Sequence, residues 1–481
     1  MSGMTNSLGE LGDVPSDLFR RQLHEVADWI ADYRETIAER PISPNAEAGA
    51  IVRTLPERAP ERGESFAEIW RDFDQLILPG ILQWSHPQFM GYFGSTTTAP
   101  GILAEMIAAA LNVNAMTWRT SPAATELEIV VLDWLRQWLR LPSEFRGVVY
   151  DTASISTMHA LAVARERALG SVRQVGLTGR NAPRLRIYAS DQAHSSVEKA
   201  AIALGIGEDN VRRVPSDSVF RLNPHALGRM IEEDCAQGFL PIAVVATVGT
   251  TSTASVDPVA EISEIVRRHN MWLHLDAAYG GGLALLPEAA WITEGWSSAD
   301  SLVVNPHKML FVPLDFSALY LRDIGQLRDL FSLVPEYLRG DTESSITNFM
   351  DYGVQLGRRF RAVKAWMVWR TFGREGLAAR IRDHLRLAQL FAGWVKDDPR
   401  FELSAPVVMG VVCFAPRQRN RAAAERICHD LVAAINSSGR AYLTLTRLRD
   451  RSAIRLGLGN ILTTEEHLQA VWQMIASSLP A

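Results

Sequence analysis

The sequence predicts an α/β fold with a mainly parallel sheet, preceded by a helical segment and followed by a small α+β unit. Three observations lead to this prediction. At 481 residues the chain is too long for one compact core, so two or three domains are expected. Short apolar runs alternate with helical stretches through the middle of the chain, as in strands joined by crossover helices. This alternation changes after about residue 365.

Residues 1–98 are predicted to form a helical N-terminal segment. Apolar residues recur at helical spacing twice, once over residues 19–30 and once over residues 66–78. Prolines at positions 41, 44, 56 and 60 separate the two stretches and indicate an extended linker.

Residues 99–365 are predicted to form a large α/β domain. Ser121-Pro122 is a typical helix start, because a capping side chain precedes a proline in the first turn. The expected strands are the apolar runs 185–189, 242–247, 272–276, 302–305 and 318–321. The helices expected between them cover 196–204, 224–235 and 258–269. Ligands of such sheets bind beyond the carboxyl ends of the strands, so we expect the site there.

Residues 366–481 are predicted to form a small α+β domain. A helix is expected near residues 376–394, short strands around 407–414 and 453–458, and a terminal helix after Thr463.

Composition excludes several classes of function. The net charge of −5 provides no basic field for nucleic acid or for an anionic membrane surface. No apolar stretch approaches the ~20 residues that span a bilayer, and no secretory signal is visible. The three cysteines are widely spaced, which predicts neither a disulfide framework nor a structural metal site. We therefore expect a cytoplasmic protein.

Lysine is scarce in this chain. Of the 49 basic residues only four are lysine, namely Lys199, Lys308, Lys364 and Lys396. Arginine supplies charge but cannot form an imine with an aldehyde at neutral pH. A GC-rich source would also explain the ratio, so the scarcity only directs attention to the lysines that remain.

Unusual polar residues follow four of the expected strands. Asp276 ends one strand, the next strand leads into His307 and Lys308, His194 follows a third, and Thr250 follows a fourth. Each residue alone is more often a helix cap or a solvated side chain. Together they are what a pyridine aldehyde needs: a lysine for a Schiff base, a carboxylate for the ring nitrogen, a flat side chain against the ring, and hydroxyls near a helix start for a phosphate. They predict pyridoxal phosphate as cofactor.

Four motifs at these positions resemble a known family, the group II pyridoxal-phosphate decarboxylases, which includes aromatic-L-amino-acid decarboxylase. The motifs are Asn305-Pro306-His307-Lys308, His274-Leu275-Asp276-Ala277-Ala278-Tyr279, Ser190-Asp191-Gln192-Ala193-His194-Ser195-Ser196 and Ser121-Pro122-Ala123-Ala124-Thr125-Glu126-Leu127-Glu128. The separation of 32 positions from Asp276 to Lys308 also fits the family, and the resemblance runs from about Phe19 to the C-terminal helix. It implies the aspartate-aminotransferase-like fold type I with a seven-stranded sheet. It also implies an obligate homodimer with shared active sites, in which residues 1–98 take part in dimerisation.

The resemblance implies a role for each matching residue. Lys308 would bind the cofactor covalently, Asp276 would pair with the ring nitrogen, His194 would stack on the ring, and Ala278 would pack on its other face. The residues implied at the phosphate are Ala153, Ser154, Asn305 and His307, and Thr250 is implied near the Schiff base. One departure concerns Asp151, which stands before Thr152 where relatives carry a glycine. We expect its carboxylate to turn away, toward a helix N–H or an arginine.

Fold and cofactor alone leave transamination, racemisation, aldol cleavage and decarboxylation open. Residues 331–356 are predicted to form a polar loop, and Tyr337 stands where the family offers a tyrosine as the acid that protonates Cα. A tyrosine there favours release of an amine over formation of an aldehyde. An aldehyde synthase or aminotransferase on the same cofactor is the alternative enzyme. An intact set of site residues argues against a catalytically silent scaffold.

The substrate is predicted from five residues at family positions. Trp84, Tyr92 and Phe93 form an aromatic lining, which favours the side chain of tryptophan, tyrosine, dopa or phenylalanine. Asn114 and Met116 replace an aliphatic residue and a phenylalanine of aromatic-specific relatives, and Gly94 replaces a proline. These changes predict a roomier, more polar pocket, so a non-aromatic substrate stays an alternative.

Overall fold

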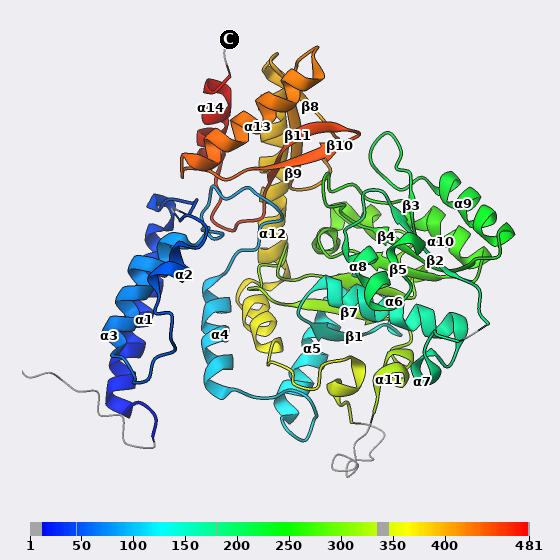
Figure 1. Ribbon diagram of the computed structural model, residues 1–481, viewed down its shortest axis with the longest axis horizontal. Coiled ribbons are helices and arrows are strands. Elements are labelled where there is room, and N and C mark those ends of the chain that lie inside the picture. Colours follow the sequence, from blue (N-terminus) through cyan, green and yellow to red (C-terminus); the bar gives the residue numbers. More distant parts are fainter. Residues whose placement is uncertain (1–11, 45, 180, 334–345, 480–481) are drawn as a thin grey trace, which may run out of the picture.

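The protein is described by a computed structural model that covers residues 12–44, 46–179, 181–333 and 346–479 (Figure 1). Its centre is a seven-stranded sheet of order β1-β7-β6-β5-β4-β2-β3. The strands are β1 Arg146–Tyr150, β2 Leu185–Ser190, β3 Val211–Val214, β4 Leu240–Thr247, β5 Trp272–Asp276, β6 Ser301–Val304 and β7 Ser317–Leu321. Neighbouring strands from β3 to β6 are parallel, and β7 runs antiparallel to both of its neighbours. The mainly parallel sheet and its five expected strands are confirmed.

Helices cover both faces of this sheet. Alternate residues of β4 face two separate cores, Val244 and Ala246 on one side and Ala243 and Val245 on the other. The first core includes residues of α5 Pro122–Trp138, α9 Pro224–Ala236 and α10 Val259–Arg268. The second includes residues of α6 Ala153–Leu169, α8 Ser196–Ala203 and α11 Gly325–Phe331. The start of α5 is as predicted, because the Ser121 hydroxyl accepts a hydrogen bond from the Ala124 N–H at 3.2 Å.

The N-terminal helices lie along one side of the molecule, apart from the sheet (Figure 1). They are α1 Ser16–Thr36, the short α2 Ala50–Thr54, α3 Phe66–Asp72 and α4 Ala99–Leu111. The ring of Trp29 packs edge-on against Trp70 of α3, with 5.6 Å between centroids. No residue of α1 is buried, and Leu103, Ile107 and Leu111 form an exposed apolar stripe on α4. An apolar surface is therefore left uncovered within the single chain.

The C-terminal part contains an antiparallel sheet of order β10-β11-β9-β8. Its elements are β8 Phe401–Leu403, β9 Val411–Pro416, α13 Arg421–Ser437, β10 Thr444–Leu448, β11 Arg451–Gly457 and α14 Glu465–Ser477. The long helix α12 Ala362–Asp397 leads into this part from the large sheet (Figure 1). The domain boundary predicted after residue 365 falls inside α12, so the division into domains stays a prediction.

The described residues contain neither a membrane-spanning helix nor a metal-binding cluster. None of the described helices is long and apolar enough to cross a membrane. The same part of the chain contains no group of three or more histidine, cysteine or acidic side chains arranged to hold a metal ion.

Candidate active site

A cavity of about 700 Å³ opens at the carboxyl ends of β4, β5 and β6. The predicted site residues that line it are Tyr92, Phe93, Ala153, Ser154, His194, Asp276, Ala278, Asn305, His307 and Lys308. The structure thus brings together most of the residues expected to hold a cofactor, at the edge of the sheet where parallel strands place ligands.

Lys308 lies in the short loop that follows β6. Its backbone N–H donates to the Asn305 carbonyl at 2.9 Å, and its Nζ lies 4.8 Å from the centroid of the Phe93 ring. Among the residues that the structure describes, Nζ has neither a hydrogen-bond nor an ion-pair partner. Burial lowers the pKa of Lys308, the Asp276 carboxylate raises it, and the Arg455 guanidinium lowers it. A lower pKa leaves more of the amine neutral, and the neutral amine is the form that attacks an aldehyde.

Asp276 ends the central strand β5 and is 6% exposed. Its neighbours β4 and β6 fix its backbone, since the Asp276 carbonyl accepts from the Val248 N–H at 2.8 Å. Oδ1 accepts from the Ala278 N–H at 3.1 Å. The carboxylate is held by one backbone bond, so it can still accept from a group inside the cavity.

His194 stands between β2 and α8. Its Nδ1 accepts from the Ser196 N–H at 3.1 Å, which orients the ring and leaves the other ring nitrogen to carry the proton. Burial is the main cause of the lowered pKa of His194, so the imidazole is neutral at neutral pH. A neutral flat ring at the cavity wall suits contact with another ring.

The N-terminus of α6 forms another wall of the cavity. Ala153 and Ser154 are its first two residues, and their N–H groups lie in the first turn, where a helix offers no carbonyl partner. The Asp151 Oδ1 accepts from the backbone N–H of the adjacent Thr152 at 2.6 Å and from its hydroxyl at 3.2 Å, so among the described residues its hydrogen-bond partner is neither an N–H of α6 nor an arginine. Thr152 itself lines the cavity.

His307 and Asn305 complete this wall. The Nδ1 of His307 accepts from the Phe316 N–H at 3.0 Å, so its Nε2 carries the hydrogen. Burial lowers the pKa of His307 to about 3, which keeps the ring neutral. Asn305 is buried, and its Oδ1 has no hydrogen-bond partner among the described residues. Unpaired polar atoms at Lys308 and Asn305, beside a helix N-terminus, fit a phosphorylated pyridine aldehyde.

Several predicted site residues do not line this cavity within the described chain. The Thr250 hydroxyl bonds inside its own loop, 3.0 Å from the Thr253 hydroxyl and 3.0 Å from the Ser255 N–H. Trp84 stacks on Tyr92, with 5.5 Å between centroids. Asn114 accepts from the Arg358 N–H at 2.9 Å and donates to the Met116 sulfur at 3.4 Å. Tyr337 lies outside the described residues. The roles of all five stay predictions.

Two residues that were not among the predicted site residues also line this cavity, namely Arg455 from the small sheet and Tyr279 from the turn after β5. Arg455 of β11 is 5% exposed and lies with its Cζ 4.7 Å from the Phe93 centroid, and its Nε donates to the Ser252 carbonyl at 3.1 Å. Tyr279 stacks on Phe93 with 3.9 Å between centroids. A signal for Arg455 existed, because an arginine in the middle of an apolar strand needs a buried partner.

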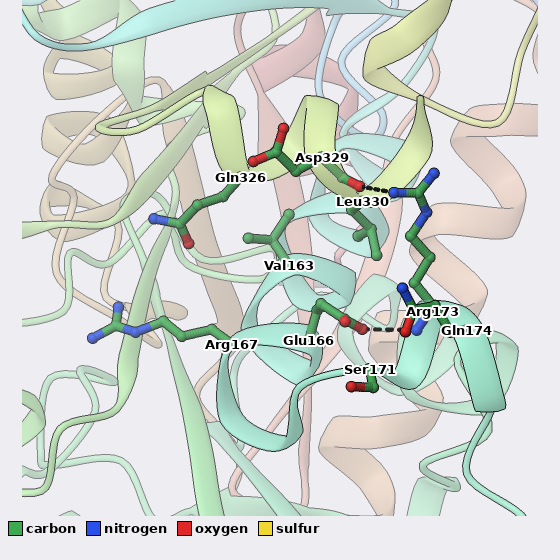
Figure 2. Close-up of a pocket in the computed structure, with 9 residues that line it drawn as sticks. All are labelled: Val163, Glu166, Arg167, Ser171, Arg173, Gln174, Gln326, Asp329 and Leu330. Atoms are coloured by element: carbon green, nitrogen blue, oxygen red, sulfur yellow. Dashed lines mark hydrogen bonds between the residues drawn. The ribbon is translucent and has the colours of Figure 1, made fainter. Parts of the chain in front are cut away.

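A second cavity of about 480 Å³ lies between α6, α11 and the short α7 Val172–Val175 (Figure 2). There Arg173 donates to the Asp329 carbonyl, and the Glu166 carboxylate accepts from the Arg173 N–H at 2.9 Å. The predicted site residues are absent from its described lining, so the candidate chemistry belongs to the cavity at the strand ends.

A carboxylate ending one strand, a lysine after the next strand and a helix N-terminus around one cavity define the class of fold type I pyridoxal-phosphate enzymes. Oryza sativa TDC, solved with PLP and tryptamine, superposes with a TM-score of 0.93 at 34% identity, over 97% of this chain and 98% of the other. Residues 49–417 match the pyridoxal-dependent decarboxylase conserved domain, and the chain belongs to this family. It is therefore a pyridoxal-phosphate-dependent amino-acid decarboxylase.

Two further relatives bear on the substrate and the product. Tyrosine decarboxylase 2 of Arabidopsis thaliana is 38% identical over 478 residues, which cover 96% of this chain and 87% of the relative. The structure of Rhodiola rosea 4-hydroxyphenylacetaldehyde synthase superposes with a TM-score of 0.89 at 32% identity, over 96% of this chain and 98% of the other.

Proposed function

We propose that this enzyme removes the carboxyl group of an aromatic L-amino acid and releases the amine and carbon dioxide. The observation that carries the proposal is the stacked pair Phe93 and Tyr279, 3.9 Å apart, directly beside the Lys308 amine. Tyr92 and Tyr442 add two more rings to the lining, with 6.2 Å between their centroids. Such rings favour a flat apolar side chain through buried area and offset stacking.

The proposed roles follow from the positions of the side chains. Pyridoxal phosphate, when bound, supplies an electron sink for the bonding pair that the departing carboxyl group leaves behind. Lys308 binds the cofactor, and Asp276 keeps a proton on the ring nitrogen. His194 and Ala278 are proposed to enclose the ring, and Thr250 is proposed to act near the amine although its hydroxyl bonds within its own loop in the single chain. The residues proposed to hold the phosphate are Ala153, Ser154, Asn305 and His307.

A panel of amino acids tests the proposal. Carbon dioxide release is measured for tyrosine, tryptophan, dopa and phenylalanine against glutamate and other non-aromatic acids, with the organic product identified in each reaction. We expect the aromatic acids to give amines. An aldehyde with ammonia and peroxide would establish the aldehyde synthase, and a keto acid the aminotransferase. Preference for a non-aromatic acid is the alternative that the outer lining of Asn436, Thr444 and Thr446 favours.

For Tyr337→Phe we expect amine formation to fall by roughly 10²–10⁴-fold, the usual contribution of a positioned acid. The phenol is proposed to protonate Cα after carbon dioxide leaves, and phenylalanine has no proton to give. Amine release by the reconstituted variant is compared with the wild type, while visible absorbance reports the bound cofactor. An unchanged rate of amine release would remove Tyr337 from the mechanism.

A homodimer with shared active sites is proposed on two observations. The apolar stripe of Leu103, Ile107 and Leu111 is uncovered, and α1 buries none of its residues within the single chain. Trp84, Asn114 and Met116 do not line the cavity of their own chain, so a second copy would be the route by which they reach a site. A reducing, cytoplasmic location is proposed because Cys235, Cys413 and Cys428 are all free thiols.

A further inference from the structure

Lys364 is a buried lysine in a chain that contains four. It stands in the first turn of α12 and is 1% exposed. Its Nζ lies 2.7 Å from Glu105 Oε1, and it donates to the Asp315 carbonyl at 2.8 Å and to the Pro313 carbonyl at 3.3 Å. An ammonium has three N–H donors, so these three acceptors satisfy it fully. Burial lowers the pKa of Lys364, and Glu105 and Asp315 raise it.

The Pro313 and Asp315 carbonyls that accept from Lys364 lie in the second half of the loop that joins β6 to β7. The first half of the same loop carries Asn305, His307 and Lys308. This loop leaves β6 at Asn305 and enters β7 at Ser317, and the Val312 N–H donates to the Pro306 carbonyl at 3.3 Å. Asp315 is fixed a second time, because its carboxylate accepts from the Arg361 Nε at 2.8 Å. Lys364 therefore restrains the segment from 313 to 315 from outside the cavity.

One peptide group connects Lys364 to His307. The carbonyl of the Asp315–Phe316 peptide accepts from Lys364, and the N–H of the same peptide donates to His307 Nδ1 at 3.0 Å. A cation on the carbonyl polarises the peptide and strengthens its N–H as a donor. That N–H can only donate, so Nδ1 stays without a proton and Nε2 carries one. Burial is the main cause of the lowered pKa of His307, and Lys364 lowers it further, so the ring stays neutral and carries a single N–H.

We propose that Lys364 is a positioning residue for the phosphate of the cofactor. It holds the Asp315–Phe316 peptide so that His307 keeps the tautomer with an N–H at Nε2, the donor that a phosphate oxygen accepts. This inference rests on the proposed role of His307 at the phosphate. Lys364, although outside the cavity, would then contribute to cofactor affinity through the phosphate and not through the pyridine ring.

The test compares pyridoxal phosphate with pyridoxal, which lacks the phosphate. The full chain is prepared without cofactor, and the Kd of each compound is measured by titration. The variant is Lys364→Met combined with Glu105→Gln, so that Glu105, whose other carboxylate oxygen pairs with Arg359, does not present a charge to an apolar side chain. We expect the preference for pyridoxal phosphate over pyridoxal to fall about 10-fold, the lower end for loss of an orienting partner. The Kd of pyridoxal should stay unchanged.

Two matched variants serve as controls. Glu105→Gln alone should keep the wild-type preference. Arg186→Met removes another buried cation, 8% exposed, which donates to the Asp209 carbonyl at 2.7 Å and lies in β2 away from His307. It should lower the free energy of unfolding without changing the preference. If the Lys364 variant raised the Kd of both compounds by the same factor, Lys364 would have a merely structural role and the inference would be overturned. An unchanged preference would overturn it as well.

His307→Leu separates this inference from the proposed phosphate site. Loss of the preference in His307→Leu, with the preference intact in the Lys364 variant, would overturn the inference and leave the phosphate site standing. A preference intact in His307→Leu would overturn both. If the double variant does not fold, Lys364→Arg is measured instead. Its changed donor geometry should give a preference between those of the wild type and His307→Leu, and an unchanged preference would overturn the inference.

Discussion

Lys308→Ala is expected to lower amine formation by at least about 10³-fold and to abolish covalent attachment of the cofactor. Lys308 is the lysine that lines the described cavity, and its Nζ is free of partners among the described residues. Lys364 cannot replace it, because its ammonium is 1% exposed and fully hydrogen-bonded. Borohydride reduction of the wild type followed by peptide mass analysis should find the cofactor on Lys308, and the variant should carry none.

Lys396→Ala is the matched control for Lys308→Ala. Lys396 lies near the end of α12 and is exposed, so its removal should change neither visible absorbance nor turnover. A Lys308→Ala variant that retains visible absorbance after dialysis and remains covalently modified by borohydride would overturn the assignment of the cofactor lysine. Partial rescue by added primary amines is a further test, since they can supply the missing nitrogen from solution.

The central strands could be predicted from short apolar runs in the sequence, because those strands are buried on both faces of the sheet. β5 and β6 read as short apolar runs, and their observed bounds differ from the predicted ones by at most one residue. The strands that were not predicted lie at the two edges of the sheet. β3 carries two arginines in four residues, and β1 begins Arg146-Gly147, so neither resembles a buried run. Edge strands need less apolar surface, and local sequence therefore identifies them poorly.

The long helix α12 contains the predicted helix and an additional segment before it. The helix was expected near residues 376–394, and it begins at Ala362. Gly373 interrupts it with φ of 62°, a left-handed conformation that suits glycine and produces a kink. The apolar residues before the kink, such as Val368 and Trp369, are buried against the large sheet's core. Two helical segments therefore meet at Gly373, and the predicted helix corresponds to the second of them.

A site residue could be predicted where it directly follows a strand that the sequence itself reveals. Asp276 and Lys308 each follow a buried run directly, so the topology of a parallel sheet brings them to the same edge. Arg455 reaches the same cavity from a strand about 150 residues further along the chain, by packing of the small sheet against the Ser252 loop. No local pattern specifies that contact. Thr250 illustrates the converse, because its loop turns the hydroxyl toward Thr253 and Ser255.

Asp276→Asn is expected to lower turnover by roughly 10²–10³-fold, the range for loss of one preorganised electrostatic partner, while the cofactor stays bound. The carboxylate is proposed to keep the ring nitrogen protonated, and a neutral amide cannot hold that proton by charge. The amide has nearly the same shape, so the bond that Asp276 accepts from the Ala278 N–H can persist. Carbon dioxide release per bound cofactor is the measurement, with visible absorbance giving the occupancy.

Asp257→Asn is the matched control, because Asp257 is also a buried aspartate, 2% exposed, that accepts two backbone N–H bonds at 2.7 Å. Its pKa is raised to about 7, mainly by burial. A raised pKa means that the fold favours its protonated form, so the stability it contributes is present at low pH and is lost as the pH rises through about 7. Asp257→Asn should therefore remove the pH dependence of stability that lies between the ordinary pKa of 3.8 and about 7, and it should also lower stability at every pH, because the amide nitrogen cannot accept one of the two backbone N–H bonds. Turnover per bound cofactor should stay at the wild-type level. Equal turnover in Asp276→Asn and Asp257→Asn would show that the carboxylate at the end of β5 does not act on the ring nitrogen.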